Sequence, residues 1–265
     1  MDTTLLSIAL AASMILMLAL GVWVSLTLVG IGVLGLLLSG NDQIGLLFAT
    51  SSWGASTGWS LTALPMFIWM GEVLFRTRLS EDLFKGLSPW MGGLPGKLLH
   101  VNILSCGIFA AVSGSSAATA ATIGRMTLPE LKAQGYSDRM AVGTLAGSGT
   151  LGLLIPPSII LIVYGVAAEV SIGRLFIAGA LPGLMLVVMF MGYTMVWAAL
   201  NKNEMPKHKK EHISFSAKIK ALRMLLPIVG LIVFVLGSIY AGFTTPTEAA
   251  ALGVFGALLL AAVTG

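Results

Sequence analysis

The chain has 265 residues, of which 57% are apolar and only 10% are charged, and its mean hydropathy is +0.95. A soluble domain does not sustain this balance over its whole length, so the sequence predicts an all-α polytopic membrane protein. The formal charge of +4 does not indicate nucleic-acid binding, because seven of the 15 Lys and Arg residues lie in one stretch, 202–223, which the positive-inside rule assigns to the cytoplasmic side.

Three membrane spans are expected in residues 1–78. The apolar run 5–38 is too long for a single span, because about 20 residues cross the hydrocarbon core, and we divide it at Gly21. The following stretch, 40–60, is polar and has no Lys or Arg, so we expect a connection on the side opposite the cytoplasm. A third span is expected over 61–75.

Residues 79–93 are expected to form an amphipathic helix at the membrane interface. Ser80 is a residue type that commonly caps a helix N-terminus. Glu81 and Asp82 place negative charge in the next turn, where it is favourable for the helix dipole. This polar start beside apolar residues is typical of a helix that lies on a membrane surface.

Residues 94–134 are expected to form a re-entrant helical hairpin. Their apolar segment, bounded by Lys97 and Arg125, contains the uncharged cluster SGSSAATAATIG at 113–124. As one helix this segment would be about 40 Å long, which exceeds a hydrocarbon core of about 30 Å. Two half-length helices that fold back fit better, and they also keep the basic stretch 202–223 on the cytoplasmic side.

A broken helix and a following span are expected in residues 135–200. The apolar segment 139–168 is interrupted by GTLAGSGTLGLLIPPS at 143–158. Glycines and the Pro156–Pro157 pair should unwind the helix there, because proline lacks a backbone donor and glycine adds no stiffness. The next span is expected over 173–200.

The last quarter of the chain is expected to begin a second structural repeat. Residues 201–224 hold the basic stretch and should form a cytoplasmic loop with an interfacial helix. Two spans are expected over 225–241 and 247–264, in the segment 225–265. They echo the first two spans in the opposite orientation, which is the layout of an inverted repeat.

The two uncharged interruptions are the candidate binding site. Broken helix at membrane depth persists only where it lines a cavity or is buried by protein, and we expect the two gaps to face each other across an aqueous chamber. Neutral oxygens without a carboxylate or histidine favour Na⁺ over a divalent or transition metal. The residues expected to bind the cation are Ser113, Gly114, Ser115, Ser116, Gly147, Ser148, Gly149, Thr150 and Pro156.

Other interpretations remain open beside this one. Small residues could merely allow close helix packing, and the proline pair could be only a kink. An intramembrane serine protease would need a histidine beside a serine, and nothing in the sequence arranges His100 in that way, so no enzyme is expected. The weaker candidates near span ends or in the basic loop are Glu72, Glu169, Glu248, His208 and His212.

Three stretches, GSSAATAATIG, GTLGLLIPPSIILIVYGVAAEVSIGRLFIAGALPG and FTTPTEAAALGV, resemble the large membrane (permease) subunit of tripartite ATP-independent periplasmic (TRAP) transporters. The resemblance implies an elevator-type, Na⁺-driven importer of small carboxylates, such as a C4-dicarboxylate or sialic acid, in a bacterial inner membrane. The transport domain would comprise 94–134 and 135–200, and the spans in 1–78 and 225–265 would be scaffold.

The same resemblance implies partners and substrate contacts. The partners would be a small four-helix membrane subunit and a periplasmic solute-binding protein, and no cofactor other than the coupling Na⁺ is implied. One wall of the substrate site would be formed by Ser116, Thr119, Pro157 and Ser158. Family members are longer, with a second hairpin and a second broken helix, so this chain alone is not expected to transport. The alternatives are an elevator carrier of the divalent-anion/sodium symporter type and a non-transporting membrane scaffold fragment.

Overall fold

The structure is a computed structural model that describes the whole chain except residues 1–2, 41–42, 207–213 and 265. The described residues contain α-helices and short 3₁₀ helices and no β-strand, as the all-α prediction requires. The chain divides into two compact units, Met1–Gly58 and Trp59–Gly265, and each is described by itself.

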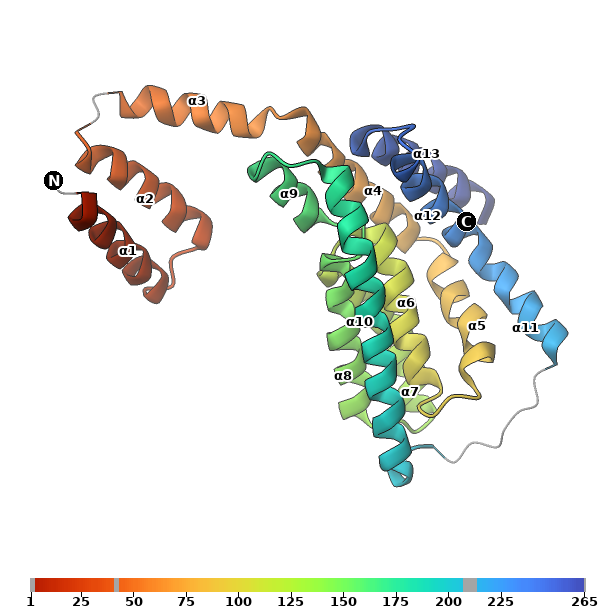
Figure 1. Cartoon of the computed structure of the whole chain (residues 1–265). Helices are drawn as coiled ribbons and strands as arrows, with labels where there is room; N and C mark the ends of the chain where they lie inside the picture. Colours follow the sequence, from red (N-terminus) through yellow and green to blue (C-terminus); the bar gives the residue numbers. More distant parts are fainter. Residues whose placement is uncertain (1–2, 41–42, 207–213, 265) are drawn as a thin grey trace. The chain divides into compact units, whose positions relative to one another are not determined.

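The first unit contains three apolar helices. Its first two lie side by side (Figure 1), and the chain reverses at Gly21, whose φ of 77° is a left-handed value that glycine adopts at little cost. The division predicted at Gly21 is therefore confirmed. The two helices are in van der Waals contact, since a Cβ on Gly35 would lie 3.4 Å from Leu10 Cδ1. The helices are α1 (Thr3–Ala19), α2 (Val24–Leu38) and α3 (Ile44–Ser56).

The helix α3 was not expected, because its residues were interpreted as a polar connection. Its hydroxyls bond back to carbonyls of their own helix, as in the 2.9 Å bond from Thr50 Oγ1 to Leu46 O and the 2.7 Å bond from Ser56 Oγ to Ser52 O. Serine and threonine in this arrangement satisfy their polar groups without leaving the helix. Composition alone therefore overstated how irregular this stretch is.

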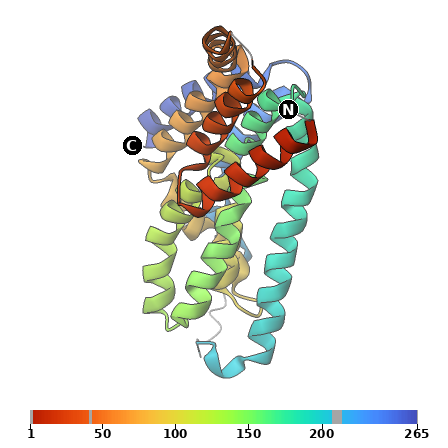
Figure 2. The same cartoon turned by 90° about the vertical axis from the view of Figure 1, so that its left-hand side faces the viewer.

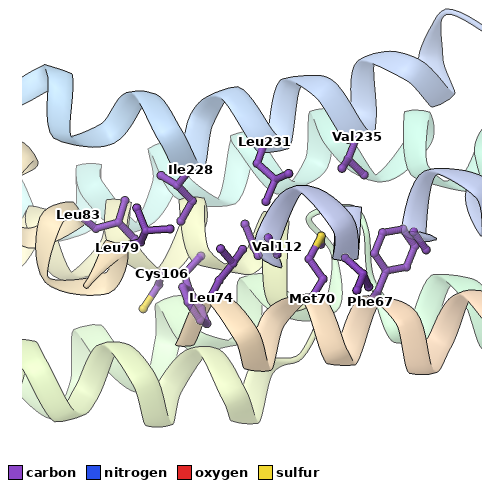
Figure 3. Packing of buried hydrophobic residues seen from close by; sticks show 14 of the residues in the cluster. Phe67, Met70, Leu74, Leu79, Leu83, Cys106, Val112, Ile228, Leu231 and Val235 are labelled. Atoms are coloured by element: carbon purple, nitrogen blue, oxygen red, sulfur yellow. The ribbon is translucent and has the colours of Figure 1, made fainter. Parts of the chain in front are cut away.

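The second unit packs most of its helices around one main apolar core. Most of the buried side chains come from α4, α5, α6, α12 and α13, others come from α7 to α10, and Figure 3 shows Met70, Leu74, Leu83, Val112 and Leu231 among them. The elements are η1 (Trp59–Thr62), α4 (Ala63–Phe75), α5 (Leu79–Met91), α6 (Leu98–Ser113), α7 (Ser116–Ala133), α8 (Asp138–Gly149), η2 (Thr150–Leu153), α9 (Ile159–Ala167), α10 (Ile172–Leu200), η3 (Lys202–Glu204), α11 (Phe215–Leu222), η4 (Arg223–Leu225), α12 (Leu226–Tyr240) and α13 (Pro246–Thr264).

Three of the described helical segments are long and apolar enough to cross a membrane. They are Ile172–Leu200, Phe215–Tyr240 and Pro246–Val263. Small residues bring α13 close to α4, since a Cβ on Gly253 would lie 2.6 Å from Met70 Sδ. The chain is thus a helical protein with several candidate membrane spans.

The expected amphipathic helix is present as α5, but its apolar face is turned inward. Leu79, Leu83 and Leu87 lie on one helix face at i, i+4 and i+8, and all three are buried in the core that α6 shares. The helix begins at Leu79, one residue before the predicted cap, and Arg78 occupies the N-cap position. The face that the sequence assigned to a membrane surface therefore packs against the protein.

The predicted hairpin is present as α6 and α7. The chain turns at Gly114, which has a left-handed φ of 59°, and Ser115 caps α7 by accepting a 3.3 Å hydrogen bond from Ala118 N–H. At the open end of the hairpin, Leu99 of α6 and Leu131 of α7 lie in one buried cluster. Figure 2 shows α7 joined to α8 by a short turn at the same end, with the long α10 beside them.

The predicted broken helix is also present, but its break is shorter than expected. Gly147, Ser148 and Gly149 form the last turn of α8 and are not unwound. The break comprises η2 and the loop 154–158, which includes a cis peptide bond between Pro156 and Pro157. The glycines permit unwinding but do not require it, because the α8 backbone continues its hydrogen bonding through them.

Candidate functional site

The tip of the hairpin and the break after α8 contact each other through their backbones. The N–H of Ile159 donates a 3.1 Å hydrogen bond to the carbonyl oxygen of Gly114. A Cβ on Gly114 would lie 2.5 Å from the carbonyl oxygen of Pro157, so no larger side chain fits there without displacement. The two interruptions predicted from sequence therefore come together in space.

A second backbone contact joins η2 to the start of α7. A Cβ on Gly152 would lie 2.7 Å from the carbonyl carbon of Ser115 and 2.8 Å from the backbone nitrogen of Ser116. A Cβ on Gly149 would lie 3.0 Å from Ala120 Cβ. The gaps were expected to face each other across an aqueous chamber, but at these glycines they are in direct contact.

Four helix ends meet at this contact. The C-terminal ends of α6 and α8 carry partial negative charge from carbonyls, and the N-terminal ends of α7 and α9 carry partial positive charge from N–H groups. The arrangement presents neutral oxygens and backbone donors within one small region. Carbonyl ends of this kind favour cations and N–H ends favour anions.

The hydroxyl groups of Ser113, Ser115 and Thr119 form hydrogen bonds within the hairpin. Ser113 Oγ and Thr119 Oγ1 share a 2.8 Å hydrogen bond between two buried side chains. Ser113 Oγ also donates a 3.3 Å bond to Ser115 O. Ser115 and Ser116 are half-buried, so the tip is closed from behind while these two serines remain reachable.

The hydroxyl groups of the broken helix bond to nearby carbonyls of the same segment. Ser148 Oγ donates to Thr144 O at 2.6 Å, and Ser158 Oγ donates to Leu153 O at 2.7 Å. Both serines are fully buried. Thr150 Oγ1 donates to Gly147 O at 2.6 Å, and its side chain is exposed. Thr150 is thus the hydroxyl of this segment that a solute can reach.

A buried polar network holds both hairpin helices to α8. Thr127 Oγ1 donates to Asn102 Oδ1 at 2.9 Å, and Asn102 Nδ2 donates to Thr144 Oγ1 at 3.1 Å and to Ala141 O at 3.3 Å. Sequence reasoning did not assign the two threonines to this network. The available signal was a lone asparagine in an apolar helix, since such a residue needs partners when it is buried.

The weaker candidates have ordinary structural roles. Glu72 forms an exposed 2.8 Å ion pair with Arg76 one turn later, and Glu248 caps α13 by accepting a 2.7 Å bond from Thr245 N–H. Glu169 is exposed just after α9 and has a left-handed φ of 54°. His208 and His212 lie outside the described residues. In the described ranges no three side chains of the metal-ligating types lie together.

The serine protease interpretation fails on geometry. His100 is buried near the start of α6, and its Nε2 is hydrogen-bonded to Pro95 O. The serines of the tip follow 13 or more residues later, which is about 20 Å along a helix axis at about 1.5 Å per residue. A catalytic base must lie within hydrogen-bonding reach of its nucleophile, so His100 does not activate these serines.

Comparison with known proteins identifies relatives over most of the chain. The family described as "Tripartite ATP-independent periplasmic transporter, DctM component" matches residues 11–265. The chain is 38% identical over 201 residues to an ectoine TRAP transporter large permease protein of Halomonas elongata, with 76% of this chain and 46% of the relative covered.

Two further relatives carry different substrate names. A C4-dicarboxylate TRAP transporter large permease protein of Pseudomonas aeruginosa is 38% identical, covering 83% of this chain and 51% of the relative. A sialic acid TRAP transporter large permease protein of Vibrio cholerae is 33% identical, covering 84% and 52%. The chain spans about half the length of the curated relatives it matches. Their names are those of transport proteins, in agreement with the expectation that the chain is not an enzyme.

Proposed function

Since the chain belongs to the DctM component family of the tripartite ATP-independent periplasmic transporters, we propose that it forms part of the substrate pathway of a Na⁺-coupled importer of small organic acids. The observation that carries this proposal is the Gly114–Ile159 contact, which joins the C-terminal end of α6 in one break to the N-terminal end of α9 in the other. Transporters of several folds use such broken helices to hold their coupling ion and substrate. The substrate would be a C4-dicarboxylate, sialic acid or a similar carboxylate.

In this proposal Na⁺ binds between the hairpin tip and the last turn of α8. The ligands would come from 113–116 on the hairpin and from 147–150 on α8 and η2, together with the loop at Pro156. All the donors are carbonyl or hydroxyl oxygens, which suit a monovalent cation that must also leave. The C-terminal ends of α6 and α8 add favourable negative potential.

The substrate carboxylate would bind at the N-terminal ends of α7 and α9. Ser116 is the half-buried hydroxyl at the first position of α7, so it would contact the anion directly. Thr119, Pro157 and Ser158 are buried, and they would support this wall from behind. This division of roles refines the four residues expected from sequence.

The proposed setting is a bacterial inner membrane. There the chain would assemble with a small four-helix membrane subunit and would receive substrate from a periplasmic solute-binding protein. In an elevator mechanism the hairpin and broken helix would move as one body against the scaffold spans. The two backbone contacts between them, at Gly114 and at Gly152, support a common movement.

Sodium-dependent protection from cysteine labelling tests the cation site. Ser115→Cys and Thr150→Cys, made one at a time in the full-length protein, place thiols at a half-buried and an exposed position of the site. The native Cys106 is fully buried and gives little background. We expect Na⁺ to slow maleimide labelling of both thiols by at least about threefold relative to K⁺, because a bound ion holds the site closed.

The control is Ser171→Cys, which is exposed at the start of α10 and away from the two breaks. Its labelling should be the same in Na⁺ and K⁺. If Na⁺ changes neither Ser115→Cys nor Thr150→Cys, the cation role fails. The direct contact between the gaps would then serve packing, as in the scaffold alternative.

A further inference from the structure

The outer face of α11 carries an apolar stripe that no described residue covers. Phe215, Ile219 and Leu222 are 68%, 44% and 43% exposed. They lie at i, i+4 and i+7, which places them on one helix face. The stripe continues through Leu226 and Val233 of α12, which are 62% and 63% exposed.

One flank of α11 and the following η4 are fixed to α5, and the stripe is turned away from this contact. A Cβ on Gly86 would lie 2.7 Å from Leu225 Cδ2 and 3.1 Å from Ala221 O. Trp90 Nε1 donates a 3.2 Å hydrogen bond to Lys218 O. These contacts set the rotation of α11 about its own axis, because Lys218 and Ala221 lie about 70° and 130° from the centre of the stripe, on the same side of the helix.

Basic side chains flank the stripe on both sides. At about 100° per residue, Lys218 and Arg223 fall about 70° to either side of its centre, and Lys220 lies beyond Arg223. Lys218 Nζ lies 6.0 Å from the centroid of the Trp90 ring, which holds it at one edge. Residues 214–226 contain no acidic residue. An apolar stripe between basic edges is the pattern of a helix that contacts a charged membrane surface.

The length of the helix places this face at the level of the lipid headgroups. The segment Phe215–Tyr240 has 26 residues, or about 39 Å, whereas the hydrocarbon core is about 30 Å thick. Because α12 is the more apolar part, the excess of about two turns falls on α11. We propose that the outer face of α11 binds anionic phospholipid headgroups at the membrane surface.

Lipid is the occupant that fits both parts of this face. The stripe runs without interruption into the exposed apolar face of a candidate membrane span, so the same acyl chains would cover both. The phosphate of the headgroup would meet Lys220 and Arg223, which form no ion pair in the described part of the chain. Each basic residue near an anionic membrane surface strengthens binding to that surface by about fivefold.

Quenching by brominated lipids tests this proposal in nanodiscs. A fluorophore on Ile219→Cys reports the stripe, and one on Val233→Cys reports a lipid-facing position within the span. The nanodiscs contain phosphatidylcholine with about one third phosphatidylglycerol, and bromine is carried by one lipid or the other. We expect brominated phosphatidylglycerol to quench the label at 219 at least about threefold more per molecule than brominated phosphatidylcholine, and both lipids to quench equally at 233.

The charge variants decide whether the headgroup is recognised. We compare the ratio of quenching by brominated phosphatidylglycerol to quenching by brominated phosphatidylcholine. The double variant Lys220→Gln with Arg223→Gln should lower this ratio at 219 to its value at 233, while the contacts of Lys218 with α5 stay intact. Lys132→Gln with Arg139→Gln removes the same charge from the exposed turn between α7 and α8 and should leave the ratio unchanged. The proposal is overturned if the wild-type ratio equals one or survives the α11 variant. Absence of quenching at 219 by either lipid would instead place a protein partner on this face.

Discussion

The N–H of Ile159, at the start of α9, donates a hydrogen bond to the carbonyl oxygen of Gly114, the residue at which the hairpin reverses. This bond joins residues that are 45 positions apart in the sequence. Gly114 follows the last residue of α6 and Ile159 is the first residue of α9, so each has a backbone group that its own helix does not satisfy. The two breaks satisfy each other, and neither can move far without exposing an unpaired group.

Gly114→Ala should destabilise the protein more than a matched glycine change. Its φ of 59° is unfavourable for alanine by about 1 to 2 kcal/mol, and the new Cβ would lie 2.5 Å from Pro157 O. Gly135 has a similar φ of 79°, and in the described part of the chain nothing would lie within 4 Å of its Cβ, so Gly135→Ala carries the backbone cost alone. We expect the free energy of unfolding to fall by at least about 3 kcal/mol for Gly114→Ala and by about 1 kcal/mol for Gly135→Ala. Unfolding in detergent measures both, and equal losses would contradict the close contact.

Gly152→Ala and Gly143→Ala should change stability in opposite directions. A Cβ at 152 would lie 2.7 Å from the backbone of Ser115, just before α7, whereas a Cβ at 143, within α8, would meet no described atom within 4 Å. Alanine stabilises an open helical position by about 0.5 to 1 kcal/mol relative to glycine. The midpoint of thermal unfolding should therefore rise for Gly143→Ala and fall for Gly152→Ala. A rise in both would show that η2 and α7 are further apart than described.

Asn102→Ala should be costly, and Ser105→Ala should not. Removing Asn102 takes partners from Thr127 and Thr144, although each threonine keeps a bond to a carbonyl of its own helix. The loss should be about 2 kcal/mol. Ser105 is equally buried, one turn later on α6, and its hydroxyl has no hydrogen-bond partner among the described residues. Its replacement by alanine should leave stability unchanged or raise it. Denaturant unfolding of both variants compares the two, and a similar loss in each would contradict the network.

Both ends of the hairpin should be reached from one side of the membrane. Leu99 and Leu131 share a buried cluster, which places the start of α6 beside the end of α7. Thiols at exposed positions just outside them, Gly93→Cys and Lys132→Cys, should both react with an impermeant maleimide from the cytoplasmic side. Reaction from opposite sides would mean that α6 and α7 cross the membrane as one span.

The sequence predicted the hairpin and the broken helix because their causes are local. Lys97 and Arg125 bound a segment too long for one span, and a proline pair has no helical alternative at 156–157. The helix α3 was missed because serine and threonine can bond within a helix as well as end one. Gly147–Gly149 were expected to unwind, but glycine lowers helix propensity by only about 1 kcal/mol per residue, and the last turn of α8 remains helical.

The contacts within the site could not be read from local patterns. That Gly152 lies against Ser115, or that Thr127 and Thr144 both bond to Asn102, depends on how three helices pack at long sequence separation. A pattern shows which residues are small or polar, but not which pairs meet. At Gly114 and Gly152 the two segments touch where the sequence suggested an aqueous chamber, because two small-residue segments can close the space between them.

The helix α5 connects α6 to α11. Its leucines are embedded in the core shared with α6, and its Trp90 is fastened to the backbone of α11. If lipid holds α11 in place, a shift of the hairpin along the membrane normal would either move α11 as well or break the hydrogen bond from Trp90 to Lys218. In the proposed elevator mechanism, α5 would then limit the distance over which the hairpin and the broken helix move.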